Sequence, residues 1–61
     1  MKKYMIIFSI KKETVFEYIA CFDDIQRCAE FVLDLEGLHV AYHVFRLEEE
    51  NGGFKYVEMG V

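Results

Sequence analysis

Apolar side chains recur along the chain with two different periods, one typical of strands and one typical of a helix. Residues 3–10 (KYMIIFSI) and 14–22 (TVFEYIACF) are rich in aromatic and β-branched residues and contain neither glycine nor proline. This composition predicts two strands, and the polar step Lys11-Lys12-Glu13 between them predicts a hairpin turn.

After Asp23-Asp24 the period becomes that of an amphipathic helix. Its apolar stripe is Ile25, Cys28, Ala29, Val32 and Leu35, and its polar side carries Arg27, Glu30 and Asp34. Asp23 can accept a hydrogen bond from the free N–H groups of the first turn, with Gln26 three residues later as in a capping box. Gly37 can supply the left-handed residue that ends the helix.

Residues 38–48 return to alternation, and Asn51-Gly52-Gly53 before residues 54–59 predicts a second hairpin, because Asn and Gly tolerate positive φ. The order ββαββ predicts an α+β fold, a single antiparallel four-stranded sheet with one helix packed on one face. The third strand can lie parallel to the second through a right-handed crossover, or antiparallel to the first. We favour the second arrangement, strand order 2-1-3-4, in one domain spanning residues 1–61.

Side chains alternate across each strand, so each strand contributes one row to each side of the sheet. Under the helix we expect Tyr4, Ile6, Phe8, Ile10, Phe16, Tyr18, Ala20, Phe22, Leu38, Val40, Tyr42 and Val44, with Ile25, Cys28, Val32 and Leu35 above them. The opposite side then carries Met5, Ile7, Val15, Ile19, Cys21, Ala41, Phe45, Leu47, Phe54 and Tyr56. Its polar positions are Ser9, Glu17, His39, His43 and Glu58.

This second apolar side is unusual, because an antiparallel sheet with one wet face normally shows polar residues there. Four strands ~4.8 Å apart offer ~350 Å² of face, near the size at which an exposed apolar patch marks an interaction site. We therefore expect an interface made of Met5, Ile7, Ile19, Ala41, His43, Phe45 and Tyr56. Three alternatives remain: a row shifted by one residue in an ordinary monomer, self-association sheet against sheet as a homodimer, and binding of a different protein.

Composition predicts the cellular compartment of the chain and disfavours two classes of partner, the membrane and nucleic acid. Two cysteines are too few for a disulfide scaffold, and no leading apolar segment with a cleavage site is present, so we expect free thiols in a reducing cytoplasm. The longest apolar run, residues 4–8, is too short for a membrane span. A formal net charge of -4 disfavours direct nucleic-acid binding.

Candidate chemistry is sparse. His39 and His43 would lie ~13 Å apart on one strand face, too far to chelate one ion, so we expect no metal and no cofactor. Cys28 in the helical stripe is interpreted as a core residue, and no phosphate loop or catalytic set is present. We expect no enzymatic activity. His43 could make association depend on pH.

Acidic residues gather on or beside the outer side of the helix: Asp23, Asp24, Glu30, Asp34 and Glu36. A second cluster, Glu48-Glu49-Glu50, precedes the turn. The cluster on the helix can be a solvated face, or a negative patch that meets the basic groove of an enzyme that handles nucleic acid.

In size, acidity and topology the chain resembles phage or mobile-element accessory proteins that bind and inhibit host machinery, including RNA polymerase inhibitors and anti-CRISPR proteins. The resemblance implies an inhibitor or adaptor with a protein partner. Our first hypothesis is accordingly a non-enzymatic, homodimeric protein-binding module. The second is a structural assembly subunit whose sheet face serves oligomerisation only, and a third is a small-ligand or metal sensor that uses the histidines.

Overall fold

A computed structural model describes residues 2–9 and 18–60 of the chain. The elements are β1 (Tyr4–Phe8), β2 (Tyr18–Phe22), α1 (Ile25–Gly37), β3 (Tyr42–Glu50) and β4 (Gly53–Glu58). They form one antiparallel sheet in the order β2-β1-β3-β4, which confirms the predicted fold class and strand order. The predicted positions Ile10, Val15, Phe16 and Glu17 and the first turn lie outside the described residues.

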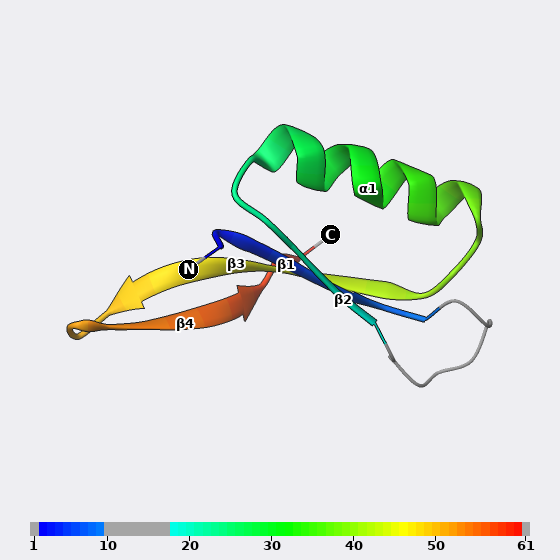
Figure 1. The fold of residues 1–61 in the computed structure, drawn as a ribbon. Coiled ribbons are helices and arrows are strands. Elements are labelled where there is room, and N and C mark those ends of the chain that lie inside the picture. The colour runs from blue at the N-terminus through cyan, green and yellow to red at the C-terminus, as the bar shows by residue number, and fades with distance from the viewer. Residues whose placement is uncertain (1, 10–17, 61) are drawn as a thin grey trace.

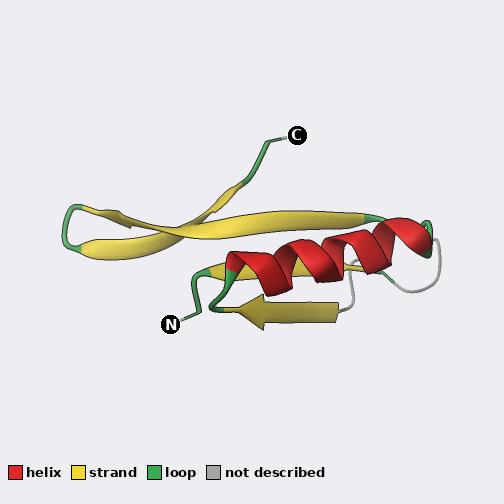
Figure 2. Cartoon of the chain, turned by 90° about the horizontal axis from the view of Figure 1, so that it is seen from above, coloured by secondary structure: helices red, strands yellow, loops and turns green. Residues whose placement is uncertain are grey.

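The helix crosses one side of the sheet, and the sheet's other side has no described element over it (Figure 1). Helix α1 contacts β2 and β1, whereas the tip of the β3–β4 hairpin extends past the N-terminal end of α1 (Figures 1 and 2). The fold therefore has two layers over β1 and β2 and a single layer at the hairpin tip.

The core lies between α1 and the sheet. Ile6, Cys28 and Leu35 are the buried apolar side chains among the described residues. Packed against them are Tyr4, Phe8, Phe22, Phe31, Val32, Val40, Tyr42 and Val44. The alternation of β1 and β3 predicted these strand positions correctly.

Phe31 joins the core although the apolar stripe of the helix did not include it. Its ring lies 5.2 Å from that of Phe8 in an edge-to-face contact and 5.4 Å from that of Phe22. Tyr18 stacks on the other side of Phe8 at 5.6 Å. The first residue of the predicted apolar stripe differs as well. Ile25 is 56% exposed and so is not buried in the core as expected.

Both ends of the helix correct the sequence prediction. The N-cap is Asp24 rather than Asp23: Asp24 has extended backbone angles, and its carboxylate accepts a hydrogen bond from the Gln26 backbone N–H at 2.9 Å. Asp23 instead pairs with the Lys2 ammonium at 3.0 Å. Because Gln26 is only two residues from this cap, the predicted capping box is wrong.

At the other end Gly37 is still helical, and the left-handed residue is His39, with φ of 56°. The His39 N–H donates to the Glu36 carbonyl at 3.1 Å, and the Val40 N–H donates to the Leu35 carbonyl at 3.4 Å. This pair of bonds is the Schellman arrangement, here with histidine where glycine is commonest. The third strand consequently begins at Tyr42, four residues later than predicted, and Leu38 is 67% exposed.

The second hairpin is confirmed. Asn51 and Gly52 have φ of 49° and 79°, the left-handed pair that a tight two-residue turn between twisted strands requires. The pairing runs from Glu50 opposite Gly53 to Phe45 opposite Glu58. This register fixes which side chains of β4 share a side of the sheet with those of β3.

Candidate functional site: the uncovered face of the sheet

The side of the sheet opposite α1 is called the far face. Residues directly opposite each other on neighbouring strands share a face, so the register identifies its members. One row is Ile19, Ile7 and His43, and the next is Cys21, Met5, Phe45 and Glu58; two pairs complete it, Leu47 with Tyr56 and Glu49 with Phe54. Ala41 precedes β3 and is exposed, and its carbonyl accepts from the Ser9 N–H at 3.1 Å. Of the predicted interface residues, the register places Met5, Ile7, Ile19, His43, Phe45 and Tyr56 on one side of the sheet, and the interface itself stays a prediction.

Apolar side chains of the far face differ in how much they are exposed to solvent. Ile19 is 67% exposed and Phe54 is 60% exposed, while Met5, Ile7, Phe45, Leu47 and Tyr56 are half-buried by their neighbours. Ser9, expected among its polar positions, is instead buried at 2% exposed. No described element lies over these residues (Figure 1), so the far face is an apolar surface without a cover from the described part of the chain.

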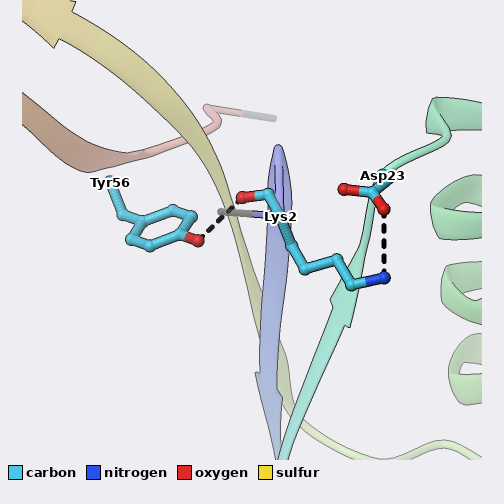
Figure 3. A network of polar contacts seen from close by, with 3 residues as sticks. All are labelled: Lys2, Asp23 and Tyr56. Carbon is cyan, nitrogen blue, oxygen red and sulfur yellow. Dashed lines mark hydrogen bonds and ion pairs between the residues drawn. The ribbon is translucent and has the colours of Figure 1, made fainter.

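Tyr56 ties β4 to the start of the chain across β3. Its hydroxyl donates to the Lys2 carbonyl at 2.8 Å, and the Lys2 ammonium in turn pairs with Asp23 at 3.0 Å (Figure 3). Three segments that are far apart in sequence are therefore joined at one end of the sheet, between β2 and β4. This contact gives the far face a fixed geometry at that end.

His43 and Glu58 are the polar pair on the far face. The His43 Nδ1 lies 2.5 Å from a Glu58 carboxylate oxygen. His39, which we expected on the same strand face, lies instead in the connection before β3 because of its left-handed backbone. The predicted role of His43 in a pH-dependent association stays a prediction.

The five acidic residues predicted beside the helix have different environments. Asp23 pairs with Lys2, Asp24 caps the helix, and the Glu36 carboxylate accepts a 2.6 Å hydrogen bond from the Tyr42 hydroxyl. This bond is the main cause that raises the pKa of Tyr42, followed by desolvation and the negative charge of Glu36. Glu30 and Asp34 are exposed and form no ion pair with another described residue. Among these five carboxylates only that of Asp23 is paired with a cation of the described residues, so the predicted acidic patch keeps most of its negative charge and its role stays a prediction.

A second apolar surface, which the sequence analysis did not anticipate, lies between α1 and the sheet beside β3. It is a groove of about 370 Å³ lined by Tyr4, Ile25, Cys28, Ala29, Val32, Leu33, Val44 and Met59. Leu33 is 66% exposed. Leu33, an apolar residue on the polar side of the helix, was the sequence signal for this groove, and the sequence prediction did not use it.

The candidate metal ligands and the two cysteines can be placed in the described part of the chain. Within residues 2–9 and 18–60, no three His, Cys, Asp or Glu side chains converge to hold a metal ion. Cys21 is an exposed free thiol, and Cys28 is buried in the core, where desolvation raises the pKa of its thiol. A raised pKa leaves less of the reactive thiolate. The helix in the described part of the chain is not long and apolar enough to cross a bilayer.

Comparison with protein families, curated proteins and solved structures gave no match for this chain.

Proposed function

We propose that the chain is a non-enzymatic protein-binding module that packs its far face against a partner protein. The observation that carries this proposal is the row of apolar side chains on a sheet surface with no described cover. Burying ~350 Å² of such a face at ~25 cal/mol per Å² contributes several kcal/mol. That gain is comparable to the whole stability of a small domain.

Charge favours a basic partner over a second copy of the chain at this face. The chain carries a formal net charge of -4, and Glu49 and Glu58 lie among the apolar residues of the far face. Two copies stacked on each other bring like charges together, whereas a partner with Lys or Arg around an apolar centre complements them. The partner we infer is therefore a protein with a basic rim around an apolar patch.

Enzymes that handle nucleic acid present such basic surfaces, because they neutralise backbone phosphates with Lys and Arg. The exposed carboxylates of Glu30 and Asp34 supply a second negative surface on the opposite side of the molecule. If the chain binds at the groove that holds the phosphates, it excludes the nucleic acid and inhibits the enzyme. If it binds elsewhere on the enzyme, it acts as an adaptor. We propose that the chain acts as an inhibitor or adaptor of an enzyme of this class.

A photo-crosslinking residue at position 45, introduced in the cell that naturally makes the chain, tests whether a partner contacts the far face. The same residue at position 33 is the control. The proposal expects the stronger adduct at position 45, and a weaker adduct at 33 would mean that the helix beside Glu30 and Asp34 also contacts the partner. The partner, identified by mass and purified, is then titrated with Ile7→Asp and with Leu33→Asp. Ile7→Asp should weaken binding at least ~100-fold, because it places a charge in the buried centre, and Leu33→Asp should change binding less than ~3-fold.

Equal adducts at both positions, or equal affinities of the two variants, contradict a far-face interface. Lysine at Glu30 and Asp34 separately tests the acidic helix. Weaker binding at low salt with an unchanged melting temperature supports it, and unchanged binding restricts the interface to the sheet.

The second candidate is an assembly subunit whose far face meets another copy of itself. The same uncovered face motivates it. Sedimentation of the purified chain separates the two: dissociation of a wild-type dimer by Ile7→Asp favours the assembly subunit, whereas a far face that self-associates only weakly favours a different partner.

A further inference from the structure

The two edges of the sheet differ in how they are protected against pairing with another strand. Edge strand β4 carries Lys55 and Glu58, and Lys55 forms an ion pair with Glu50. Edge strand β2 reads Tyr18-Ile19-Ala20-Cys21-Phe22 and carries no charge. Charged residues and bulges are the usual means by which proteins prevent edge pairing. Strand β2 has neither, because its five residues pair with β1 in an unbroken register.

The hydrogen-bond pattern shows which backbone groups of β2 point outward. The bonds Ser9 N–H to Ala41 and Leu47 N–H to Lys3 place the odd-numbered residues of β1 in hydrogen-bonded pairs with β3. In an antiparallel sheet these pairs alternate, so the even-numbered residues of β1 bond to β2. Their partners are Tyr18, Ala20 and Phe22. The N–H and C=O groups of Ile19 and Cys21 therefore point away from the sheet.

We propose that two copies of this chain pair antiparallel through the outer edges of β2, with Ala20 facing Ala20 of the second copy on a two-fold axis. In this register Ile19 of each copy is opposite Cys21 of the other. Because both residues direct their N–H and C=O outward, the two pairs exchange four backbone hydrogen bonds. An antiparallel strand pair is self-complementary under two-fold symmetry, so a second copy fits this edge without further specialisation.

The same register joins the two far faces. Ile19 and Cys21 lie on the far face of each copy, and directly opposite residues share a side of a sheet. Eight strands then present one continuous apolar surface of ~700 Å², twice the ~350 Å² of a single copy. A stable interface takes ~800 Å² from each partner, so edge pairing brings the surface close to that size. Edge pairing itself stands whether or not a partner covers the far face.

Charge-swapped variants at the axis test the proposal, because position 20 faces itself. The wild type should sediment as a dimer, and Ala20→Lys and Ala20→Glu should each raise the dimer dissociation constant at least ~10-fold through repulsion across the axis. Mixing the two variants should restore a dimer through opposite charges. A monomeric wild type, or variants that dimerise as well as the wild type, would overturn the proposal. Ala20 lies on the helix side of the sheet, opposite the buried Ile6, so circular dichroism must first show that both variants fold. If they do not fold, the disulfide test decides the proposal.

A disulfide test reads the register without relying on those variants. Ile19→Cys places a thiol opposite Cys21 of the second copy, at the ~5.5 Å Cα separation of a hydrogen-bonded pair. Mild oxidation should give a disulfide dimer, which Ile19→Cys with Cys21→Ser should not form. Ile7→Cys is the matched control, since it lies on the same face one strand further from the edge. A disulfide dimer from Ile7→Cys but not from Ile19→Cys would show stacked faces and overturn edge pairing.

The two proposals fail separately. If Ile7→Asp abolishes partner binding and leaves the dimer, the far face binds the partner and the edge binds the copy. If the Ala20 variants are monomeric and still bind the partner weakly, edge pairing adds avidity to a working far face.

Discussion

The two faces of this sheet are built from similar side chains and have different surroundings. Ile6 and Ile7 are neighbours on the central strand β1; Ile6 is 0% exposed under α1, whereas Ile7 is half-buried on the far face without a described cover. On β3, Val44 packs on the core and Phe45 lies on the far face. A strand with apolar residues on both faces therefore indicates that both faces are buried. The sequence does not say whether the chain itself or another molecule covers each face.

The largest difference in stability is expected between alanine substitutions of the two neighbouring isoleucines. Ile6→Ala should lower the free energy of unfolding by about 2–4 kcal/mol, because it removes buried methyl groups and leaves a cavity. Ile7→Ala should cost less than about 1 kcal/mol in the isolated chain, because its side chain is already partly in water. Urea titration followed by circular dichroism measures both. Equal losses would mean that the far face is as well covered as the core.

A smaller effect is expected where the helix that covers the core begins. Asp24→Ala should destabilise the fold by about 1 kcal/mol, because it leaves a first-turn N–H without its acceptor. Asp23→Ala should cost less than about 0.5 kcal/mol, since it removes only an exposed ion pair with Lys2. Thermal melts of the two variants compare them directly. A larger loss of stability for Asp23→Ala than for Asp24→Ala would mean that Asp23 is the N-cap, as the sequence predicted.

The end of the helix can be improved. His39 has φ of 56°, a conformation that costs a residue with a side chain more than it costs glycine. His39→Gly should therefore raise the free energy of unfolding by about 0.5 kcal/mol, after the larger backbone entropy of glycine in the unfolded chain is subtracted. Leu38→Gly, in the right-handed region at φ of -85°, is the control and should destabilise. A destabilised His39→Gly would show that the imidazole makes a stabilising contact.

The two tyrosine hydroxyls give a matched pair across the sheet. Tyr42→Phe on the helix side should cost about 0.5 kcal/mol, and Tyr56→Phe on the far face should cost the same or less, because both bonds are open to solvent. Tyr42 should also add a pH dependence. Its pKa is raised in the folded chain, so the unfolded chain loses the phenolic proton first and the free energy of unfolding falls as pH rises above the ordinary value of 10.0. Melts between pH 8 and 11 should show this fall in the wild type and a smaller fall in Tyr42→Phe.

Much of the fold could be predicted from the sequence because the relevant signals are local. The alternation in β1 and β3 fixed the two faces, and Asn51-Gly52 specified the second turn through positive φ. The strand order followed from the preference for an antiparallel return after the helix. These features depend on side-chain period and on turn chemistry, which single residues carry.

Features that depend on competition between neighbours could not be predicted. Asp23 and Asp24 are chemically identical, and the cap is decided by which of them has extended backbone angles while Lys2 neutralises the other. Phe31 joins the core through ring contacts with Phe8 and Phe22, which belong to two other elements. The exposure of Ile25 depends on where α1 lies over the sheet, which the helical period does not determine.

The most direct test of the far face as a binding surface is the solvent accessibility of isoleucine methyl groups, measured by nuclear magnetic resonance with a neutral paramagnetic probe in the purified chain and then with its partner. An uncovered far face predicts strong relaxation enhancement for Ile19, intermediate enhancement for Ile7, weak enhancement for Ile6, and loss of the enhancement at Ile7 when the partner binds. An Ile7 methyl as protected as that of Ile6 at every concentration of the isolated chain, or one that the bound partner leaves accessible, would contradict it.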